Sequence, residues 1–300
     1  MSKRKKQEIF FGILFALPVI FGFIIFVFMP LIVSLVVSLT DYTIAMDEIN
    51  FVGLSNYINL FNGNDIYFLN SLLVTCYYVL LSVPLQIVFS FFVALTLSAD
   101  IKGRSFFRTI FYLPTIVPAV ASSILWMMLF DPDTGIFNAI LDKLGLPTSL
   151  WIYGENTVIP SLAIMSLWTI GGTVVIFLAG IQNVPKELYE AVKVDGGNTL
   201  VRLRNITLPM VSPTIFFNLI MSFIGSFQVF SQAYIMTNGG PNNKSMFYVF
   251  YMYREAFTYG HLGVASALGW ILFIIILLLT MIVFRSSSVW VFYEGEVKNN

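Results

Sequence analysis

The chain has 300 residues, of which 58% are hydrophobic and 11% are charged, and its mean hydropathy is +0.85. A soluble domain carries about 25% charged residues, so this composition excludes a protein whose whole surface faces water. The 16 basic and 16 acidic residues cancel, no basic block beyond the N-terminus indicates a nucleic-acid partner, and the single Cys76 excludes an intrachain disulfide.

In chain order, six uncharged stretches separate the charged residues, and each is long enough for one membrane-spanning helix. Crossing a bilayer takes about 20 apolar residues in a helix. Because backbone groups in lipid must be hydrogen-bonded within the protein, we expect helices and not strands. The predicted spans are 10–38, 70–98, 107–130, 158–182, 208–234 and 263–284. The predicted fold class is therefore all-α, a polytopic membrane helix bundle with six transmembrane helices.

Two of these spans have features of their own. The first follows a basic N-terminus, as the apolar segment of a signal peptide does, but that segment has roughly 7–15 residues and this one is much longer. No small-residue cleavage site follows it, so we expect a retained helix. The third span contains Pro114 and Pro118, which we expect to kink it.

The lysines and arginines set the expected orientation, because cytoplasmic loops of membrane proteins carry an excess of both. With the N-terminus inside, 13 of the 16 fall in inside segments, and only Lys143, Lys244 and Arg254 fall outside. The inside residues are Lys3, Arg4, Lys5, Lys6, Lys102, Arg104, Arg108, Lys186, Lys193, Arg202, Arg204, Arg285 and Lys298. We therefore expect both termini in the cytoplasm.

The segment 185–209, inside by this topology, has the signals of a short helix followed by a turn. Pro185 suits a first helical turn, and Glu187 and Glu190 favour the positive end of the helix dipole. Gly196 and Gly197 can end the helix, and Gly196 is expected in a left-handed conformation.

A helix of about ten residues is marginal alone in water, so this one needs a surface to pack on. Leu188, Tyr189 and Val192 supply an apolar stripe at helical spacing. The alternative is a helix lying on the lipid surface, but its acids would be repelled by anionic lipid.

The same segment resembles the "EAA" loop of binding-protein-dependent ABC importer permeases. That pattern has Glu-Ala-Ala, an Asp-Gly-Ala turn and a later Ile-x-Leu-Pro. The matching residues are Glu190, Ala191, Asp195, Gly196, Gly197, Ile206, Leu208 and Pro209. Val192 replaces the second alanine and Gly197 the last one. We expect the glycine to matter little, and the added bulk of Val192 to alter the fit to a partner ATPase.

Four more blocks extend the resemblance over nearly the whole chain. They are Phe-Val-Gly-Leu-x-Asn-Tyr at 51–57, Lys-Gly-Arg-x-Phe-Phe-Arg at 102–108, Leu-Pro-x-x-x-Pro at 113–118 and Thr-Asn-Gly-Gly-Pro at 237–241. These blocks resemble the carbohydrate-uptake branch of the family, and within it the first of the two permeases, as in lactose, multiple-sugar, maltose and glycerol-3-phosphate uptake.

This resemblance implies the type I ABC importer permease fold, with 185–209 as a cytoplasmic coupling helix and loop. It divides the chain into 1–65 (N-terminal tail, first helix and outside loop), a five-helix core at 66–285, and a cytoplasmic tail at 286–300. The implied location is the bacterial cytoplasmic membrane, in contact with its lipid. The implied partners are a second permease, two ATP-binding subunits and an extracytoplasmic solute-binding protein.

The expected role is transport and not catalysis. The sequence has no Gly-x-x-x-x-Gly-Lys-Ser/Thr phosphate-binding loop, so we expect ATP and Mg²⁺ on a partner chain and no cofactor on this one.

Polar residues within the spans are the candidates for a solute pathway, because polar side chains facing lipid are costly. Ser222, Ser226 and Val229 share one helical face. By resemblance to the maltose-type permease, the cavity positions are Thr115, Ala119, Ser166, Thr169, Thr173, Ser222, Gly225, Ser226 and Val229. The alternative for each is helix packing, which also uses small and hydroxylated residues.

Other functions fit the sequence less well. An ion-coupled secondary transporter usually carries ionisable residues within its spans, whereas the six predicted here contain a single Asp, Glu, Lys, Arg or His, which is Arg108 at the inside end of the third. A membrane enzyme or metal site needs clustered ligands, whereas His261 is the only histidine and no metal-ligand spacing occurs. The solute stays open between a sugar and glycerol-3-phosphate or another polyol.

Overall fold

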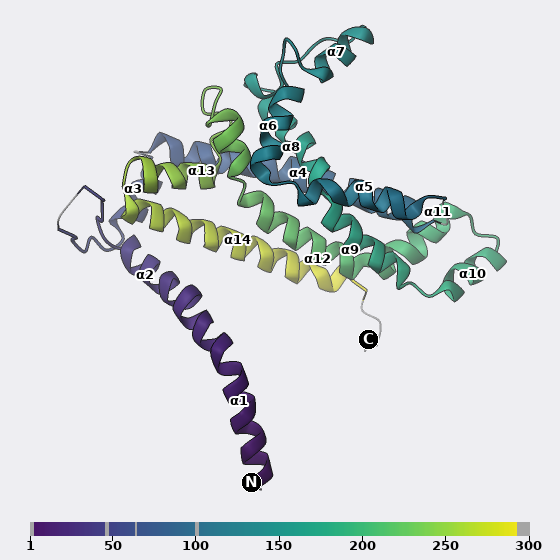
Figure 1. Cartoon of the computed structure of the whole chain (residues 1–300), viewed down its shortest axis with the longest axis horizontal. Helices are drawn as coiled ribbons and strands as arrows, with labels where there is room; N and C mark the ends of the chain where they lie inside the picture. The colour runs from purple at the N-terminus through teal and green to yellow at the C-terminus, as the bar shows by residue number, and fades with distance from the viewer. Residues whose placement is uncertain (1–2, 46–47, 64, 100–101, 293–300) are drawn as a thin grey trace. The chain divides into compact units, whose positions relative to one another are not determined.

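The computed structural model describes residues 3–45, 48–63, 65–99 and 102–292 (Figure 1). Of the bases assigned above to the inside, Lys298 and the side chains of Lys3 and Lys6 lie outside this described part. The described residues form helices, with two isolated bridges and no strand, as the sequence predicts.

The α-helices are α1 (Lys3–Phe23), α2 (Met29–Ser38), α3 (Ser55–Phe61), α4 (Ile66–Ser98), α5 (Arg104–Ile116), α6 (Ala119–Leu129), α7 (Ile136–Lys143), α8 (Val158–Ser166), α9 (Gly171–Gln182), α10 (Lys186–Val194), α11 (Thr199–Arg202), α12 (Leu208–Phe227), α13 (Tyr248–Tyr253) and α14 (Leu262–Trp290). Wider π turns occupy Ile24–Phe28, Leu203–Thr207, Ala233–Thr237 and Arg254–Thr258. Tighter 3₁₀ turns occupy Trp151–Tyr153 and Leu167–Thr169.

Four continuous helices are long and apolar enough to cross a membrane: Ile9–Ser38, Ile66–Ser98, Thr199–Phe227 and Leu262–Trp290. Two further spans exist if each of two sharply bent helix pairs counts as one. The described residues therefore hold four candidate spans, or six with the bent pairs, where the sequence predicts six.

The predicted third span, 107–130, is wrong as a single helix. It consists of α5 and α6, which meet at 102°. Pro114 stays inside α5, and the break comes at Val117, which is extended (ψ 128°) before Pro118. The ring of a proline clashes with a helical residue before it, which explains why the chain leaves the helix there.

The predicted spans 158–182 and 208–234 also differ from the structure. The predicted span 158–182 bends by 54° between α8 and α9, after the 3₁₀ turn Leu167–Thr169. The helix predicted at 208–234 begins at Thr199, nine residues earlier than predicted, and ends at Phe227. Residues 228–230 are not helical, so Gln228 and the residues after it do not continue α12.

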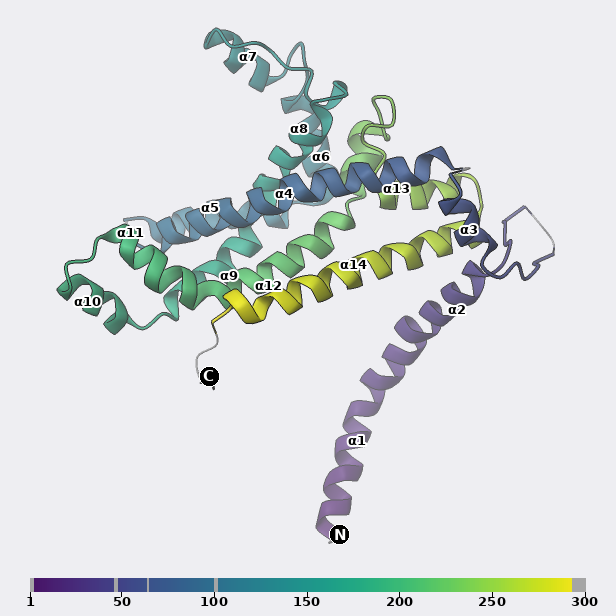
Figure 2. The ribbon, with the colours of Figure 1, turned by 180° about the vertical axis from the view of Figure 1, so that it is seen from behind.

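The chain divides into two compact units. The larger comprises 66–251 and 274–300, and its core is formed mainly where α4, α9 and α12 pack together. Phe91 of α4 meets Phe177 of α9 edge-on, with ring centroids 5.6 Å apart, and Val211 of α12 is fully buried in the same cluster. α10, α11 and the start of α5 lie together at one end of this unit (Figure 1, Figure 2).

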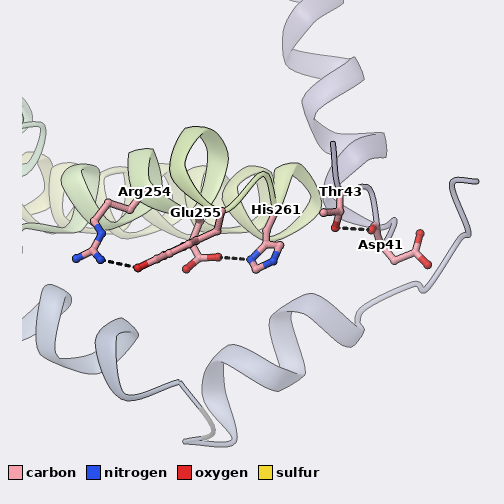
Figure 3. A network of polar contacts seen from close by, with 6 residues as sticks. Asp41, Thr43, Arg254, Glu255 and His261 are labelled. Atoms are coloured by element: carbon pink, nitrogen blue, oxygen red, sulfur yellow. Dashed lines mark hydrogen bonds and ion pairs between the residues drawn. The ribbon is translucent and has the colours of Figure 1, made fainter. Parts of the chain in front are cut away.

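The smaller unit comprises 1–65 and 252–273. His261 lies next to Glu255, with His261 Nδ1 2.8 Å from a Glu255 carboxylate oxygen, and Glu255 is buried (Figure 3). His261 also forms an isolated bridge with Thr43 of the first loop. The single histidine is thus a hydrogen-bond partner of the buried Glu255 carboxyl group. No group of three metal-binding side chains occurs in the described residues.

Candidate functional site

A cavity of about 410 Å³ opens within the larger unit. Seven of the predicted pathway residues line it: Ser166, Thr169, Thr173, Ser222, Gly225, Ser226 and Val229. Ala119 also lines it, but Thr115 does not. The Thr115 hydroxyl lies 2.6 Å from the position a Cβ on Gly171 would take, so Thr115 packs α5 closely against α9.

Three interruptions of the helices border this cavity. Val117 is the extended residue between α5 and α6, Thr169 ends the 3₁₀ turn between α8 and α9, and Val229 follows α12. Non-helical backbone at membrane depth is tolerated where it is buried in protein or lines a cavity. Discontinuous helices also form the solute sites of many transporters. The three helix breaks that the span prediction missed therefore all border this cavity.

The cavity wall offers uncharged hydrogen-bonding groups. Its described lining includes the hydroxyls of serines, threonines and Tyr78 and the amides of Gln86 and Gln232, and it includes no Asp, Glu, Lys, Arg or His. The Ser166 hydroxyl donates to the Ala163 carbonyl oxygen at 2.6 Å and can still accept a hydrogen bond.

Ser122 differs from the other hydroxyls of the wall. Its Oγ is buried and has no hydrogen-bond partner within the described structure. A buried polar group without a partner costs free energy, so a solute or a water molecule at this position would satisfy it.

Sequence reasoning missed the contribution of α4 to the wall. Tyr78 and Gln86 line the cavity, and Ser82 between them is within 3.4 Å of the Ser226 hydroxyl. These three residues are spaced by four, so they share one face of a helix. That polar stripe in an apolar span is a sequence signal that could have identified them.

The predicted coupling helix is α10, which begins directly after Pro185 and ends at Val194. Gly196 has φ +76°, as expected from the sequence, and the Gly197 amide donates to the Val192 carbonyl oxygen at 2.8 Å. Of the matching motif residues in and after α10, Glu190, Ala191, Asp195 and Gly196 are exposed, and Gly197 is half-buried.

The second half of the motif anchors this segment to the core. Ile206 and Leu208 pack against the buried cluster of α4, α9 and α12, and so does Tyr189 from α10. The Tyr189 hydroxyl lies 3.1 Å from the Thr207 hydroxyl, which ties α10 directly to the start of α12. Pro209 is the second residue of α12 and directly follows the π turn Leu203–Thr207, within the continuous helix Thr199–Phe227.

α10 and the turn after it also present apolar side chains outward. Leu188, Val194 and Leu200 have exposed fractions of 36%, 87% and 69%. Only Tyr189 and Val192 of the predicted apolar stripe are partly buried by this chain. The segment thus has one face held by its own core and another left open.

The family model described as "Binding-protein-dependent transport system inner membrane component" matches residues 66–289. The chain belongs to this family. It is therefore a membrane component of the family's transport systems, as the EAA-type segment indicates. The family's matched region begins at the first residue of α4.

Relatives of this permease cover almost its whole length. The probable ABC transporter permease protein YesP of Bacillus subtilis (strain 168) is 38% identical over 98% of this chain and 96% of its own. The arabinooligosaccharides transport system permease protein AraP of the same organism is 32% identical, over 94% and 89%. The trehalose/maltose transport system permease protein MalF of Thermococcus litoralis is 29% identical, over 94% and 95%.

A solved structure confirms the fold. A chain of a bacterial alginate ABC transporter, crystallised in complex with an alginate pentasaccharide-bound periplasmic protein, superposes with a TM-score of 0.81. It covers 94% of this chain and 95% of that one, at 22% identity. The predicted type I ABC importer permease fold is therefore correct for this chain.

Proposed function

We propose that this permease passes a neutral carbohydrate, an oligosaccharide or a monosaccharide, across the cytoplasmic membrane through the cavity described above. The observation that supports this most is the wall of hydroxyl, amide and apolar groups without a charge. A volume of about 410 Å³ lies in the usual range of small-molecule sites, about 300–1,000 Å³. The names of AraP and MalF point to neutral sugars as well.

The same wall argues against glycerol-3-phosphate. A phosphate dianion is normally balanced by the positive charge of arginine or lysine, and the described lining contains no basic side chain. An ion-coupled mechanism is disfavoured because the described cavity lining has no acid or base, and Arg108, at the inside end of the third predicted span, is the one Asp, Glu, Lys, Arg or His within the predicted spans.

Energy would come from partner chains. We assign α10 and the turn at Asp195–Gly197 to a groove on a separate ATP-binding subunit, which would cover the exposed Leu188 and Val194. The proposed complex has two such subunits, and each binds ATP and Mg²⁺. It also contains a second permease and an extracytoplasmic solute-binding protein. Tyr189 and Thr207 would pass the movement of α10 to α12, which lines the cavity.

The orientation follows from the bases. Arg104 and Arg108 lie near the start of α5, Lys186 and Lys193 lie in α10, and Arg202 ends α11. The start of α5, α10 and α11 share one end of the larger unit. An excess of lysine and arginine is typical of the cytoplasmic side. We therefore place this end, and both termini, in the cytoplasm.

The proposal is tested by competition for uptake. The complex with its partners is reconstituted in vesicles, and ATP-driven entry of labelled neutral oligosaccharides is measured against unlabelled competitors. Neutral sugars are expected to compete, while glycerol-3-phosphate at the same concentration is not. Uptake of glycerol-3-phosphate itself, blocked by no neutral sugar, would contradict the proposal.

A further inference from the structure

An apolar groove of about 430 Å³ lies between α4 and α5, apart from the cavity. Aromatic rings from both helices line it, including Phe89 and Phe92 of α4 and Phe107 and Phe111 of α5. Its one hydroxyl, on Thr96, already donates to the Phe92 carbonyl oxygen at 2.9 Å. The groove lining therefore has no side-chain hydroxyl left without a hydrogen bond, and it suits a hydrocarbon chain.

Two arginines lie at the start of α5, on the helical face that also carries Phe107 and Phe111. Residues spaced by three, four and seven share a helix face, which places Arg104 and Arg108 beside the groove lining. The Gln182 amide oxygen, in the orientation that satisfies both, accepts from Arg104 at 2.6 Å and from Arg108 at 2.7 Å.

This amide satisfies the two guanidinium groups only in part. Each guanidinium has five N–H donors, and the Nε of both arginines is buried without a partner in the described structure. No carboxylate pairs with either arginine among the described residues. Two positive charges thus meet at an uncharged oxygen, and an anion with several acceptor oxygens would complete the arrangement.

We propose that this is a binding site for an anionic phospholipid, with its phosphate at Arg104 and Arg108 and an acyl chain along the groove. It rests on the orientation proposed above, which puts the arginines at the cytoplasmic leaflet, where anionic lipids attract basic residues. A neutral lipid would fill the groove without neutralising the two arginines. A carboxylate of a partner protein would neutralise the arginines without filling the groove.

The site lies close to the coupling segment. Gln182 is the last residue of α9, and α10 begins at Lys186. A lipid phosphate on the arginines would therefore hold the start of α5 against the residue from which the chain enters the coupling helix.

The test uses the complete complex, purified in detergent, incubated with equal amounts of phosphatidylglycerol and phosphatidylcholine, washed, and analysed for bound lipid by mass spectrometry. The wild type is expected to retain phosphatidylglycerol preferentially. Arg104→Gln with Arg108→Gln is expected to reduce that preference by roughly tenfold or more. Lys143→Gln with Lys244→Gln removes two charges elsewhere and should leave the preference unchanged.

A second pair of variants tests the groove without changing charge. Thr96→Trp fills the groove and should reduce retention of phosphatidylglycerol, whereas Leu80→Trp, at a position of α4 that is 73% exposed and outside the groove, should not. Unchanged retention in the double arginine variant or in Thr96→Trp would overturn the proposal. Loss of the partner subunits from the arginine variant, equally with either lipid, would assign the arginines to a protein partner and overturn it too.

Discussion

Gly197 lies directly against the side chain of Val192, one turn back along the chain. A Cβ at position 197 would sit 2.9 Å from the Val192 carbonyl oxygen and 3.3 Å from Val201 Cγ1, and it would overlap Val192 Cγ1. The Val192 side chain and carbonyl oxygen therefore occupy the space that an alanine methyl at position 197 would need. The expectation that the glycine matters little for the coupling segment stays a prediction.

Gly197→Ala is predicted to destabilise the turn after α10 by about 1–3 kcal/mol, because it overpacks this contact. Adding Val192→Ala should restore the part of the loss that comes from overlap with Val192 Cγ1, which a double-mutant cycle on ATP hydrolysis stimulated by the binding protein would measure. Gly172→Ala is the control, since a Cβ there meets nothing within 4 Å. Equal losses in the single and double variants would show that the two residues are not coupled.

Gly196→Ala is predicted to weaken the coupling segment for a different reason. Gly196 has φ +76°, a left-handed conformation that costs a residue with a Cβ about 1–2 kcal/mol. Gly196→Pro should be worse, because the Gly196 amide donates to the Lys193 carbonyl oxygen at 3.2 Å. We expect ATP hydrolysis and transport to uncouple while the chain still inserts, measured as hydrolysis per solute transported. Wild-type coupling in Gly196→Pro would contradict the assignment of α10.

The first loop should respond to acid. The Asp41 carboxylate accepts hydrogen bonds from the Asn50 amide at 2.7 Å and from its side-chain nitrogen at 3.2 Å. These bonds lower the pKa of Asp41 below its ordinary value of 3.8. A lowered pKa means that the stabilisation is complete above that value and is lost as pH falls through the lowered one.

Hydrogen exchange of the Asn50 amide, corrected for intrinsic rates, should therefore be constant from neutral pH down to about 4 and rise below it. In Asp41→Asn the amide should be less protected at neutral pH, and the acid step should disappear. An acid step that persists in this variant would mean that another group controls the loop.

Reporter fusions test the orientation. Fusions after Phe61 and Pro147 should report outside, and fusions after Gly103 and Asn198 should report inside, because the bases gather on the inside. An inside signal at Pro147 would also remove the basis for placing Arg104 and Arg108 at the cytoplasmic leaflet.

Composition and periodicity are enough to predict the helices and the left-handed Gly196, whereas most of the cavity wall was predicted from the resemblance to the maltose-type permease. Seven predicted residues meet there, of which six are serine, threonine or glycine, and Ser222, Gly225 and Ser226 share a face of α12. Hydropathy measures how long and apolar a stretch is, however, and not where it points. The 102° turn at Val117 could therefore not be obtained from it, although Pro118 marks the place.

Contacts between distant segments could not be predicted from the sequence either. The link between Tyr189 and Thr207, and that between Ser82 and Ser226, depend on how helices pack, which no local pattern encodes. The close packing of Gly197 against Val192 could not be predicted either, because it is set by the path of the turn.

The central claim is that solute passes through the cavity beside α12, and blocking that cavity tests it most directly. Ser222→Trp places an indole on the cavity wall, while Phe217→Trp changes a residue of α12 that is 50% exposed and outside the wall. ATP-driven uptake of the transported sugar is measured in vesicles for both, with copurification of the partner subunits as the control for assembly. The account predicts that Ser222→Trp abolishes uptake in an intact complex while Phe217→Trp transports like the wild type; normal uptake by Ser222→Trp would contradict it.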